Sequence, residues 1–384
     1  MTMTKVLLVD TGFSSVPIYN ELCLMGYEVH VVGANPSDCL AKSSKHYWNI
    51  NYADTEALAN LIEQECFEFI VPGCTDRSYR SCVEVSNGRF PGIESVDVDI
   101  SINNKAKFRE LVCQLNLPTP QVQGLSNGQL RWPLIVKPVD AFSGKGITVI
   151  YTENHDQIER AIEDACKASE QGEYIIEDFV IGELYSHSAF LYNGKVVQDF
   201  IVQENGTTNP FVVDTSHVIA EPPPSTLQIL RDSVEIIASA LCLKDGLLHT
   251  QFILHENSVW LIEMTRRCPG DLYSQLIELS TGFAYVAHYI RPFLGQSIKE
   301  EIADINYRPI MRHTLTINKN QNLGYIRFNH PIQIEQWIPL SLVGDQIKPS
   351  PVSRIAILFA STNNKTELDM LYKKTINRTL YQIA

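Results

Sequence analysis

The stretch Pro133-Leu-Ile-Val-Lys-Pro-Val-Asp-Ala-Phe-Ser-Gly-Lys-Gly-Ile-Thr-Val-Ile150 decides how this chain is interpreted. Its apolar start predicts a strand that ends at Lys137, because Pro138 has no N–H to donate and restricts the residue before it. Residues 147–151 are mostly β-branched and predict a second strand. The loop between the two strands contains Ser143, Gly144, Lys145 and Gly146.

This strand–loop–strand unit suits a polyphosphate ligand. Exposed backbone N–H groups of the loop can surround phosphate oxygens, and its glycines let the backbone approach closely. The spacing matches neither the Walker A loop nor the dinucleotide fingerprint. Taken alone, the stretch equally allows an ordinary Ser-Gly hairpin beside a surface lysine.

Composition excludes several classes of function. The 384 residues suffice for two or three domains, and 45% hydrophobic with 20% charged residues is ordinary for a soluble globular protein. The net charge of −13 argues against a nucleic-acid-binding surface, which needs a basic face. It does not argue against a nucleotide ligand, because a few local lysines can dominate a pocket.

The cysteine pattern and the N-terminus indicate a cytoplasmic protein. The nine cysteines are scattered, and their odd number excludes complete pairing within one chain. The chain starts with an expected strand, Lys5-Val-Leu-Leu-Val-Asp10, without the layout of a signal peptide. No run is long enough to span a bilayer. We therefore expect neither membrane nor nucleic-acid partners.

Residues 1–103 predict an α/β domain with a parallel sheet, because strands and helices alternate with short turns. The turn after the first strand has one glycine, Gly12, where the dinucleotide fingerprint needs three, so a nicotinamide cofactor is not expected. Ligands of such sheets bind beyond the carboxyl ends of the strands. Asp76 and Arg77 follow one such end and are candidate substrate residues, or they cap the next helix.

Beyond this domain the pattern predicts α+β structure. Helices are expected over 103–115, 156–169, 225–241, 271–281 and 367–379, and strands over 174–177, 185–190, 195–202, 247–254 and 259–264.

Four features follow one another in a fixed order: Lys105, Lys137 with its glycine loop, the strand exit 177–183, and Gln251 with Glu263. This order resembles the ATP-grasp superfamily, in particular its carboxylate–amine ligases, over about residues 1–300. The resemblance implies an ATP-grasp fold with a Rossmann-like preATP-grasp domain (1–103). It further implies an ATP-grasp domain (104–305, with a lid lobe at about 118–182) and a C-terminal α+β segment (306–384) that completes or flanks it.

The resemblance also implies an ATP site. Lys105 and Lys137 would contact phosphates, and residues 143–146 would close over them. Glu177 would accept from the adenine amino group, and the neighbouring residues Asp178, Phe179 and Val180 would offer backbone groups to its edge. Glu183 would contact the ribose, although it stands one position earlier than in the common pattern.

A divalent-metal site is expected on a β-hairpin. Gln251 and Glu263 lie on adjacent antiparallel strands, which a tight turn can bring to one face. By resemblance, Glu263 would hold Mg²⁺ or Mn²⁺ with Gln251 and Thr265, since hard cations prefer oxygen ligands. The family pattern Glu-x-Asn-x-Arg reads Glu263-Met-Thr265-Arg-Arg267 here. Arg267 would contact the γ-phosphate and the acyl-phosphate.

The segment after this hairpin would line the substrate pocket, with Arg266 and Asp271 as candidates. Asp271 could orient an amine or cap the helix that follows. His249, on the same strand face as Gln251, is expected to be a buried structural histidine.

The expected function is an ATP- and magnesium-dependent ligase that activates a carboxylate as an acyl-phosphate and joins it to an amine. One alternative is an ATP-binding sensor or scaffold that has lost catalysis, which the Thr265 replacement keeps open. Another is a carbamoyl-phosphate-type ATP-grasp enzyme. A homodimer is possible, and the sequence identifies neither substrate.

Overall fold

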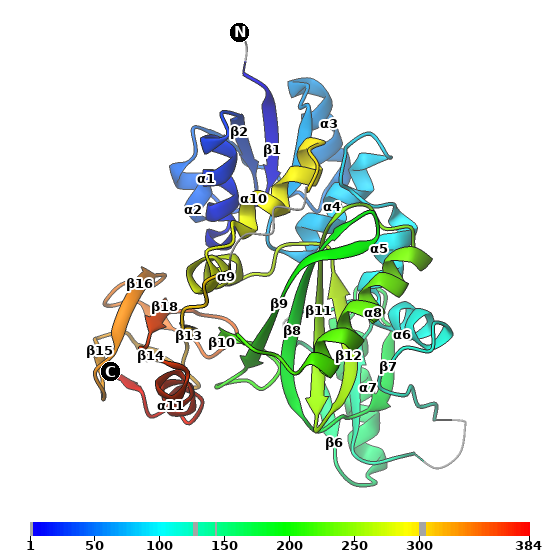
Figure 1. The fold of residues 1–384 in the computed structure, drawn as a ribbon, viewed down its shortest axis with the longest axis vertical. Helices are drawn as coiled ribbons and strands as arrows, with labels where there is room; N and C mark the ends of the chain where they lie inside the picture. Colours follow the sequence, from blue (N-terminus) through cyan, green and yellow to red (C-terminus); the bar gives the residue numbers. More distant parts are fainter. Residues whose placement is uncertain (1–2, 126–129, 143, 299–304) are drawn as a thin grey trace.

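A computed structural model of the protein describes residues 3–125, 130–142, 144–298 and 305–384. The described chain forms a parallel N-terminal sheet, a small three-stranded sheet and a large eight-stranded sheet (Figure 1). Two further sheets have only two short strands each.

The N-terminal sheet has the strand order β3-β2-β1-β4 and is parallel throughout, as predicted. Its strands are almost wholly apolar because helices cover both faces. The strands are β1 (Lys5–Val9), β2 (Glu28–Val32), β3 (His46–Trp48) and β4 (Phe69–Pro72). The helices are η1 (Phe13–Ser15), α1 (Val16–Leu24), α2 (Cys39–Ser43), α3 (Thr55–Glu65) and α4 (Asp76–Ser86).

Two helices connect this domain to the rest, where the sequence indicated one. α5 (Val96–Asn103) begins at Ser95, whose hydroxyl accepts from the Val98 N–H. α6 (Lys105–Gln114) begins at Asn104, whose side chain accepts from the N–H groups of residues 106 and 107. This cap places Lys105 in the first turn of α6.

The small sheet has the order β6-β5-β7, in which the central strand β5 (Leu134–Pro138) is antiparallel to both β6 (Thr148–Ile150) and β7 (Tyr174–Asp178). The helix α7 (His155–Ala168) packs on it. Apolar side chains of both form a separate core, which includes Leu134, Ile150 and Ile158.

The large sheet has the order β12-β11-β8-β9-β10-β13-β18-β16. Its strands are β8 (Glu183–Tyr192), β9 (Lys195–Asn205), β10 (Thr215–Val218), β11 (Gly246–His255), β12 (Ser258–Thr265), β13 (Ile310–Leu315), β16 (Gln333–Pro339) and β18 (Ala356–Ser361). The last three come from the C-terminal segment, so that segment extends the same sheet. The domain boundaries themselves stay predictions.

Different helices cover the two faces of the large sheet. α8 (Pro224–Ala240) packs on one face, against Ala189, Ile201 and Leu248. α9 (Tyr273–Thr281) and α10 (Tyr285–Ile290) pack on the other and join its core to that of the N-terminal domain; Figure 1 shows α10 beside α1. The remaining elements are η2 (Arg291–Leu294), α11 (Lys365–Ile376) and the strand pairs β14 (Gln321–Asn322) with β17 (Gln346–Ile347) and β15 (Ile326–Phe328) with β19 (Tyr381–Ile383).

Among the described residues, no helix has the length and apolarity needed to cross a membrane.

Candidate active site

A row of polar side chains crosses the face of the large sheet that α9 covers in part. The registers pair Glu263 with Gln251 and Gln251 with Ser186, and they pair Glu204 with Ser216 and Ser216 with Arg312. Strand alternation keeps these positions on one face. The row therefore runs over six adjacent strands, from β12 to β13.

The predicted pairing of Gln251 with Glu263 is confirmed by the register of β11 and β12. The Glu263 side chain is 44% exposed, and its Oε2 lies 3.9 Å from Lys105 Nζ. The Gln251 amide donates from Nε2 to Glu204 Oε2 at 2.7 Å. Within the described chain, no group donates a hydrogen bond to Gln251 Oε1.

Lys105 reaches this row from α6. Its Nζ donates to the Ala141 carbonyl at 2.9 Å, and the residue is buried. Phe142 lies beside the same ammonium group, 5.6 Å from ring centroid to Nζ. Lys105 thus connects the Glu263 end of the large sheet to the loop that follows β5.

Lys137 lies in a buried charged group with Glu177 and Arg109. The register pairs Ile135 with Glu177, so Lys137 is its diagonal neighbour on the same face, and the two side chains form an ion pair. Arg109 donates to both Glu177 oxygens, at 2.9 and 3.2 Å. Both partners occupy the Glu177 carboxylate, so an adenine amino group would have to compete with them. The adenine contact of Glu177 stays a prediction.

Burial and ion pairing together set the pKa values of Lys137 and Glu177. It lowers the pKa of Lys137 to about 8, although Glu177 opposes the change. Burial alone would raise the pKa of Glu177, but Lys137 and Arg109 outweigh it and hold that pKa below its ordinary value. The sequence reasoning missed Arg109. Its spacing from Lys105, one helical turn earlier on the same face of α6, was the available signal.

The strand exit after β7 has few free backbone donors. The Asp178 N–H donates to the Gln121 carbonyl and the Phe179 N–H to the Pro133 carbonyl. The Val180 N–H has no acceptor within the described part of the chain. Of the three residues predicted to face the adenine edge, Val180 therefore has the free N–H donor. Glu183 is exposed and accepts from the Tyr185 hydroxyl at 2.9 Å.

The glycine loop follows β5, and Ser143 lies outside the described residues. Gly144 and Gly146 both have positive φ, at 70° and 67°. A Cβ at Gly144 would come within 2.8 Å of Phe211 Cβ, and one at Gly146 within 2.7 Å of Ala168 Cβ. Both glycines are therefore required by backbone conformation and by packing. Lys145 is exposed.

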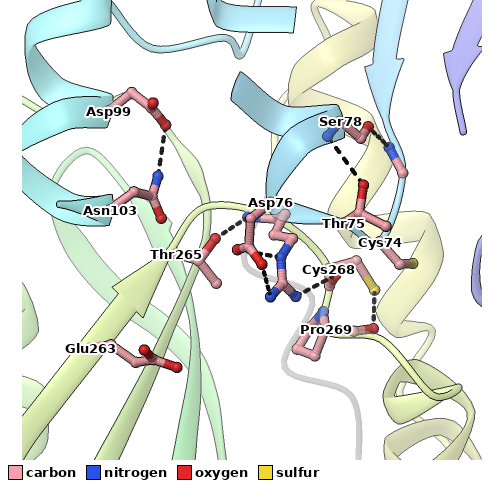
Figure 2. Close-up of polar contacts among 12 residues, drawn as sticks. Cys74, Thr75, Asp76, Ser78, Asp99, Asn103, Glu263, Thr265, Cys268 and Pro269 are labelled. Atoms are coloured by element: carbon pink, nitrogen blue, oxygen red, sulfur yellow. Dashed lines mark hydrogen bonds and ion pairs between the residues drawn. The ribbon is translucent and has the colours of Figure 1, made fainter. Parts of the chain in front are cut away.

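Arg267, just beyond β12, forms an ion pair with Asp76 of the N-terminal domain. Figure 2 shows Asp76 beside Thr265 at the end of β12. Arg267 donates from Nε and Nη2 to the two Asp76 oxygens, at 2.7 and 2.8 Å. Burial would lower the pKa of Arg267, but the Asp76 carboxylate outweighs it and raises that pKa further. Asp76 is the first residue of α4, and Thr75, not Asp76, supplies the cap.

Thr265 is the last residue of β12 and lies two residues after Glu263, on the same face of the sheet. It is buried, pairs with His249 across the sheet, and its hydroxyl accepts from the Arg267 N–H at 3.4 Å. Figure 2 shows Thr265 and Glu263 along the same strand. His249 is buried, and its Nδ1 lies within hydrogen-bond distance of Ser188 Oγ, at 2.9 Å. Burial lowers the pKa of His249 to about 3. A neutral structural histidine fits this environment.

Of the other three substrate candidates, Arg77 and Arg266 lie away from the row, whereas the Asp271 carboxylate lies 3.8 Å from Arg312 Nη1 at the β13 end of the row. Arg77 pairs with Glu170 at the surface. Arg266 is buried and held by Glu94 at 3.2 Å and by the Lys244 carbonyl at 2.7 Å, which gives it a structural role. Asp271 does not cap α9; its carboxylate lies 3.3 Å from Arg354 Nε.

The two other charged members of the row, Glu204 and Arg312, were not among the predicted site residues. Glu204 accepts from the Ser186 hydroxyl at 2.8 Å, and burial raises its pKa. Arg312 is 2% exposed and donates to Ser216 Oγ and the Asp271 carbonyl, both at 2.9 Å. The signal for Glu204 was its place on the apolar face of β9, two residues after Val202.

A second cluster, Glu28, His30 and His46, has the residue types of a metal site on the N-terminal sheet. Trp48 Nε1 donates to His30 Nδ1 at 3.1 Å, so the proton of a neutral His30 is on Nε2, where it donates to Glu28. This tautomer leaves His30 no free ring nitrogen for a metal.

The row, by contrast, fits a hard divalent cation. Glu263 offers an exposed carboxylate, and the Gln251 amide oxygen accepts no hydrogen bond from the described residues. Carboxylate and amide oxygens are the donors that Mg²⁺ and Mn²⁺ prefer.

The amino-acid sequence matches a known domain family over the residues that build this site. Residues 130–275 match the ATP-grasp domain. The chain contains an ATP-grasp domain. The match begins before β5 and ends within α9, so it includes Lys137, Glu177, Gln251, Glu263 and Arg267.

Curated relatives share this domain at low identity. The chain is 23% identical over 296 residues to the carbamoyl phosphate synthase large chain of Archaeoglobus fulgidus, covering 72% of this chain and 26% of that protein. It is 27% identical over 188 residues to the formate-dependent phosphoribosylglycinamide formyltransferase of Mannheimia succiniciproducens, covering 46% and 47%. The chain thus spans about half, or less, of the curated relatives it matches.

The ATP-grasp fold extends over the whole chain. The crystal structure of an L-amino acid ligase from Bacillus licheniformis superposes with a TM-score of 0.81 at 17% identity, covering 100% of this chain and 99% of that one. At this identity the likeness shows the fold alone.

Proposed function

We propose that this chain is an ATP- and magnesium-dependent ligase that activates a substrate carboxylate as an acyl-phosphate and joins it to an amine. One observation carries the proposal. Lys105 Nζ from α6 lies 3.9 Å from Glu263 Oε2 on β12, and Gln251 is the strand partner of Glu263. An ammonium group and two oxygen ligands from distant segments are thus brought together in the ATP-grasp domain.

The chain's own cations would stabilise the transferring phosphoryl group. Lys105 stands beside Glu263, and Lys137 lies at the base of the glycine loop, so both can offset negative charge that develops on phosphate oxygens. Arg267 lies beyond the end of β12, where its fixed orientation by Asp76 suits a planar contact with phosphate.

Glu263 and Gln251 would hold the magnesium ion, with Thr265 at the edge of the site. When bound, the ion would neutralise charge on the ATP phosphates. The chain contributes the positions of these oxygens, which β-sheet pairing fixes before any ligand binds.

The proposed reaction has two displacements. A carboxylate oxygen of the substrate attacks the γ-phosphorus of ATP, the bond to the bridging oxygen breaks, and ADP leaves. An amine then attacks the acyl carbon, phosphate leaves, and the amine loses a proton. Positioning and exclusion of water from the acyl-phosphate are the main tasks of the protein.

The comparisons support a carboxylate as the activated group. One structural neighbour is an L-amino acid ligase, and the curated relatives include a formate-dependent formyltransferase. We infer that an amino-acid carboxylate and a second amine are the first substrates to test. The carbamoyl phosphate synthase relative supports a carbamoyl-phosphate-type enzyme as the second candidate.

The direct test measures ADP formation from ATP with Mg²⁺ and amino acids supplied singly and in pairs, with hydroxylamine added to trap the acyl-phosphate. The proposal predicts ADP formation that depends on a particular acid and a hydroxamate of that same acid. Tight ATP binding without ADP formation under every combination, bicarbonate and ammonia included, would contradict the proposal and favour a silent ATP-binding protein.

A further inference from the structure

Gln251 poses a problem of orientation that a carboxylate at its position would not. A glutamine side chain ends in one acceptor oxygen and one donor NH₂ group, which differ little in shape. Only the oxygen can serve a cation. If the amide rotated by half a turn, it would present two N–H groups to the metal site beside Glu263.

Glu204 on β9 determines which end of the Gln251 amide faces the metal site. Burial raises the pKa of Glu204, but the Ser186 hydroxyl, the Arg312 charge and the Gln251 amide all oppose that rise and favour the carboxylate. An ionised carboxylate can only accept hydrogen bonds, so only the NH₂ end of Gln251 can face it favourably. Gln251 Nε2 donates to Glu204 Oε2 at 2.7 Å, and the rotated amide would place two oxygens at that distance. The Gln251 oxygen is thereby directed away from Glu204.

Glu204 is itself held firmly. It is 5% exposed, and the Ser186 hydroxyl donates to its other oxygen at 2.8 Å. Ser186 pairs with Gln251 in the register and also contacts the Tyr273 hydroxyl at 3.0 Å. The carboxylate is therefore fixed by β8 and by α9, independently of Gln251.

We propose that Glu204 is a positioning residue that presents the Gln251 amide oxygen to the divalent cation. This inference rests on the proposed metal site at Gln251 and Glu263. The carboxylate on β9 would orient a neutral ligand on β11, so that the negative charge lies two strands away from the ligand position, across β8.

The test measures Mn²⁺ binding by electron paramagnetic resonance in the presence of ADP, so that no turnover is needed. Four variants are compared with the wild type: Glu204→Gln, Gln251→Glu, the double variant carrying both changes, and Gln198→Glu as a control on the same strand. Metal-free ADP affinity and the Tm report whether each variant is folded.

Glu204→Gln should weaken Mn²⁺ binding about tenfold, as is typical when a group that orients a metal ligand is lost. Metal-free ADP affinity should stay unchanged. The double variant exchanges the carboxylate and the amide between the strands, so it should restore Mn²⁺ affinity to within about twofold of the wild type. Gln198→Glu should bind Mn²⁺ like the wild type.

Wild-type Mn²⁺ affinity in Glu204→Gln would overturn the inference, and so would a double variant that binds no better than Glu204→Gln. Both results would leave the proposed function standing. Absence of Mn²⁺ binding by the wild type itself would overturn the metal site, and the inference with it.

Discussion

Two acidic positions at the strand ends of this protein differ in how their charge is satisfied. Asp10, after β1 of the N-terminal sheet, is 5% exposed and accepts from the N–H groups of Thr11, Gly12 and Cys74 and from the Ser15 hydroxyl. Glu263 on β12 is 44% exposed, and its ion-pair partner among the described residues is Lys105, at 3.9 Å. A satisfied carboxylate maintains the fold, whereas an unsatisfied and exposed one is available to a ligand.

The comparison argues against a phosphate site at the turn after β1. The backbone N–H groups that would surround a phosphate there already surround the chain's own Asp10. Among the described residues, the ATP-grasp domain instead leaves the Gln251 amide oxygen and the Val180 N–H without hydrogen-bond partners. Each of the following predictions tests one side of this contrast.

Glu263→Gln should show the largest effect. It keeps the shape of the side chain but removes the charge expected to hold the metal, so ADP formation should fall about 10³-fold while the Tm changes little. Steady-state kinetics with coupled ADP detection measure the rate. Glu256→Gln, in the exposed turn of the same hairpin, is the matched control and should keep wild-type kinetics.

Asp10→Ala should act on stability. It leaves the Thr11 and Gly12 N–H groups and the Ser15 hydroxyl without their acceptor, while the Cys74 N–H keeps Ser15 Oγ at 3.1 Å. The free energy of unfolding should therefore fall by about 3 kcal/mol. Urea denaturation measures it. Unchanged stability would mean that Asp10 is not the internal acceptor described above, and the contrast with Glu263 would lose its basis.

Asp76→Asn should lower kcat/KM for ATP about tenfold, because Arg267 loses the charged half of a bidentate pair that fixes its guanidinium. Arg77→Ala, one residue along α4, breaks a surface pair with Glu170 and should change kcat/KM by less than about twofold. Equal effects of the two substitutions would argue against a role for Arg267 in the cleft.

The smallest expected effect is a pH dependence. Lys137 has a pKa lowered to about 8 by burial, so its amine is charged at pH 7 and loses its proton as the pH rises through 8. Because kcat/KM reports the free enzyme, kcat/KM for ATP should fall on the alkaline side of pH 8. In Lys137→Arg the guanidinium stays protonated, and this decline should disappear. A decline of the same size in both proteins would assign it to another group.

Local pattern was enough to predict most of the fold. The Lys137 strand, the glycine loop and the Gln251–Glu263 hairpin were predicted because their signals lie within a few residues of one another. The helix α5 was missed because it stands immediately before the expected helix and shares its capping residues. The expected strand at 195–202 stopped two residues short of Glu204 and so hid it.

Contacts between distant segments could not be predicted from one sequence. Arg109 meets Glu177 across 68 residues, and Asp76 meets Arg267 across 191. Neither spacing carries a periodic signal, because tertiary packing alone brings these segments together. Asp76 was predicted as a substrate residue for its position at a strand end, yet its carboxylate holds an arginine of the ATP-grasp domain.

The central claim is that the exposed oxygen ligands on the large sheet make nucleotide binding dependent on magnesium. Calorimetric titration of ADP, with and without Mg²⁺, tests it most directly in the wild type, Glu263→Gln and Glu256→Gln. The account predicts that Mg²⁺ tightens ADP binding in the wild type and in Glu256→Gln but not in Glu263→Gln. Equal tightening in all three proteins would contradict it.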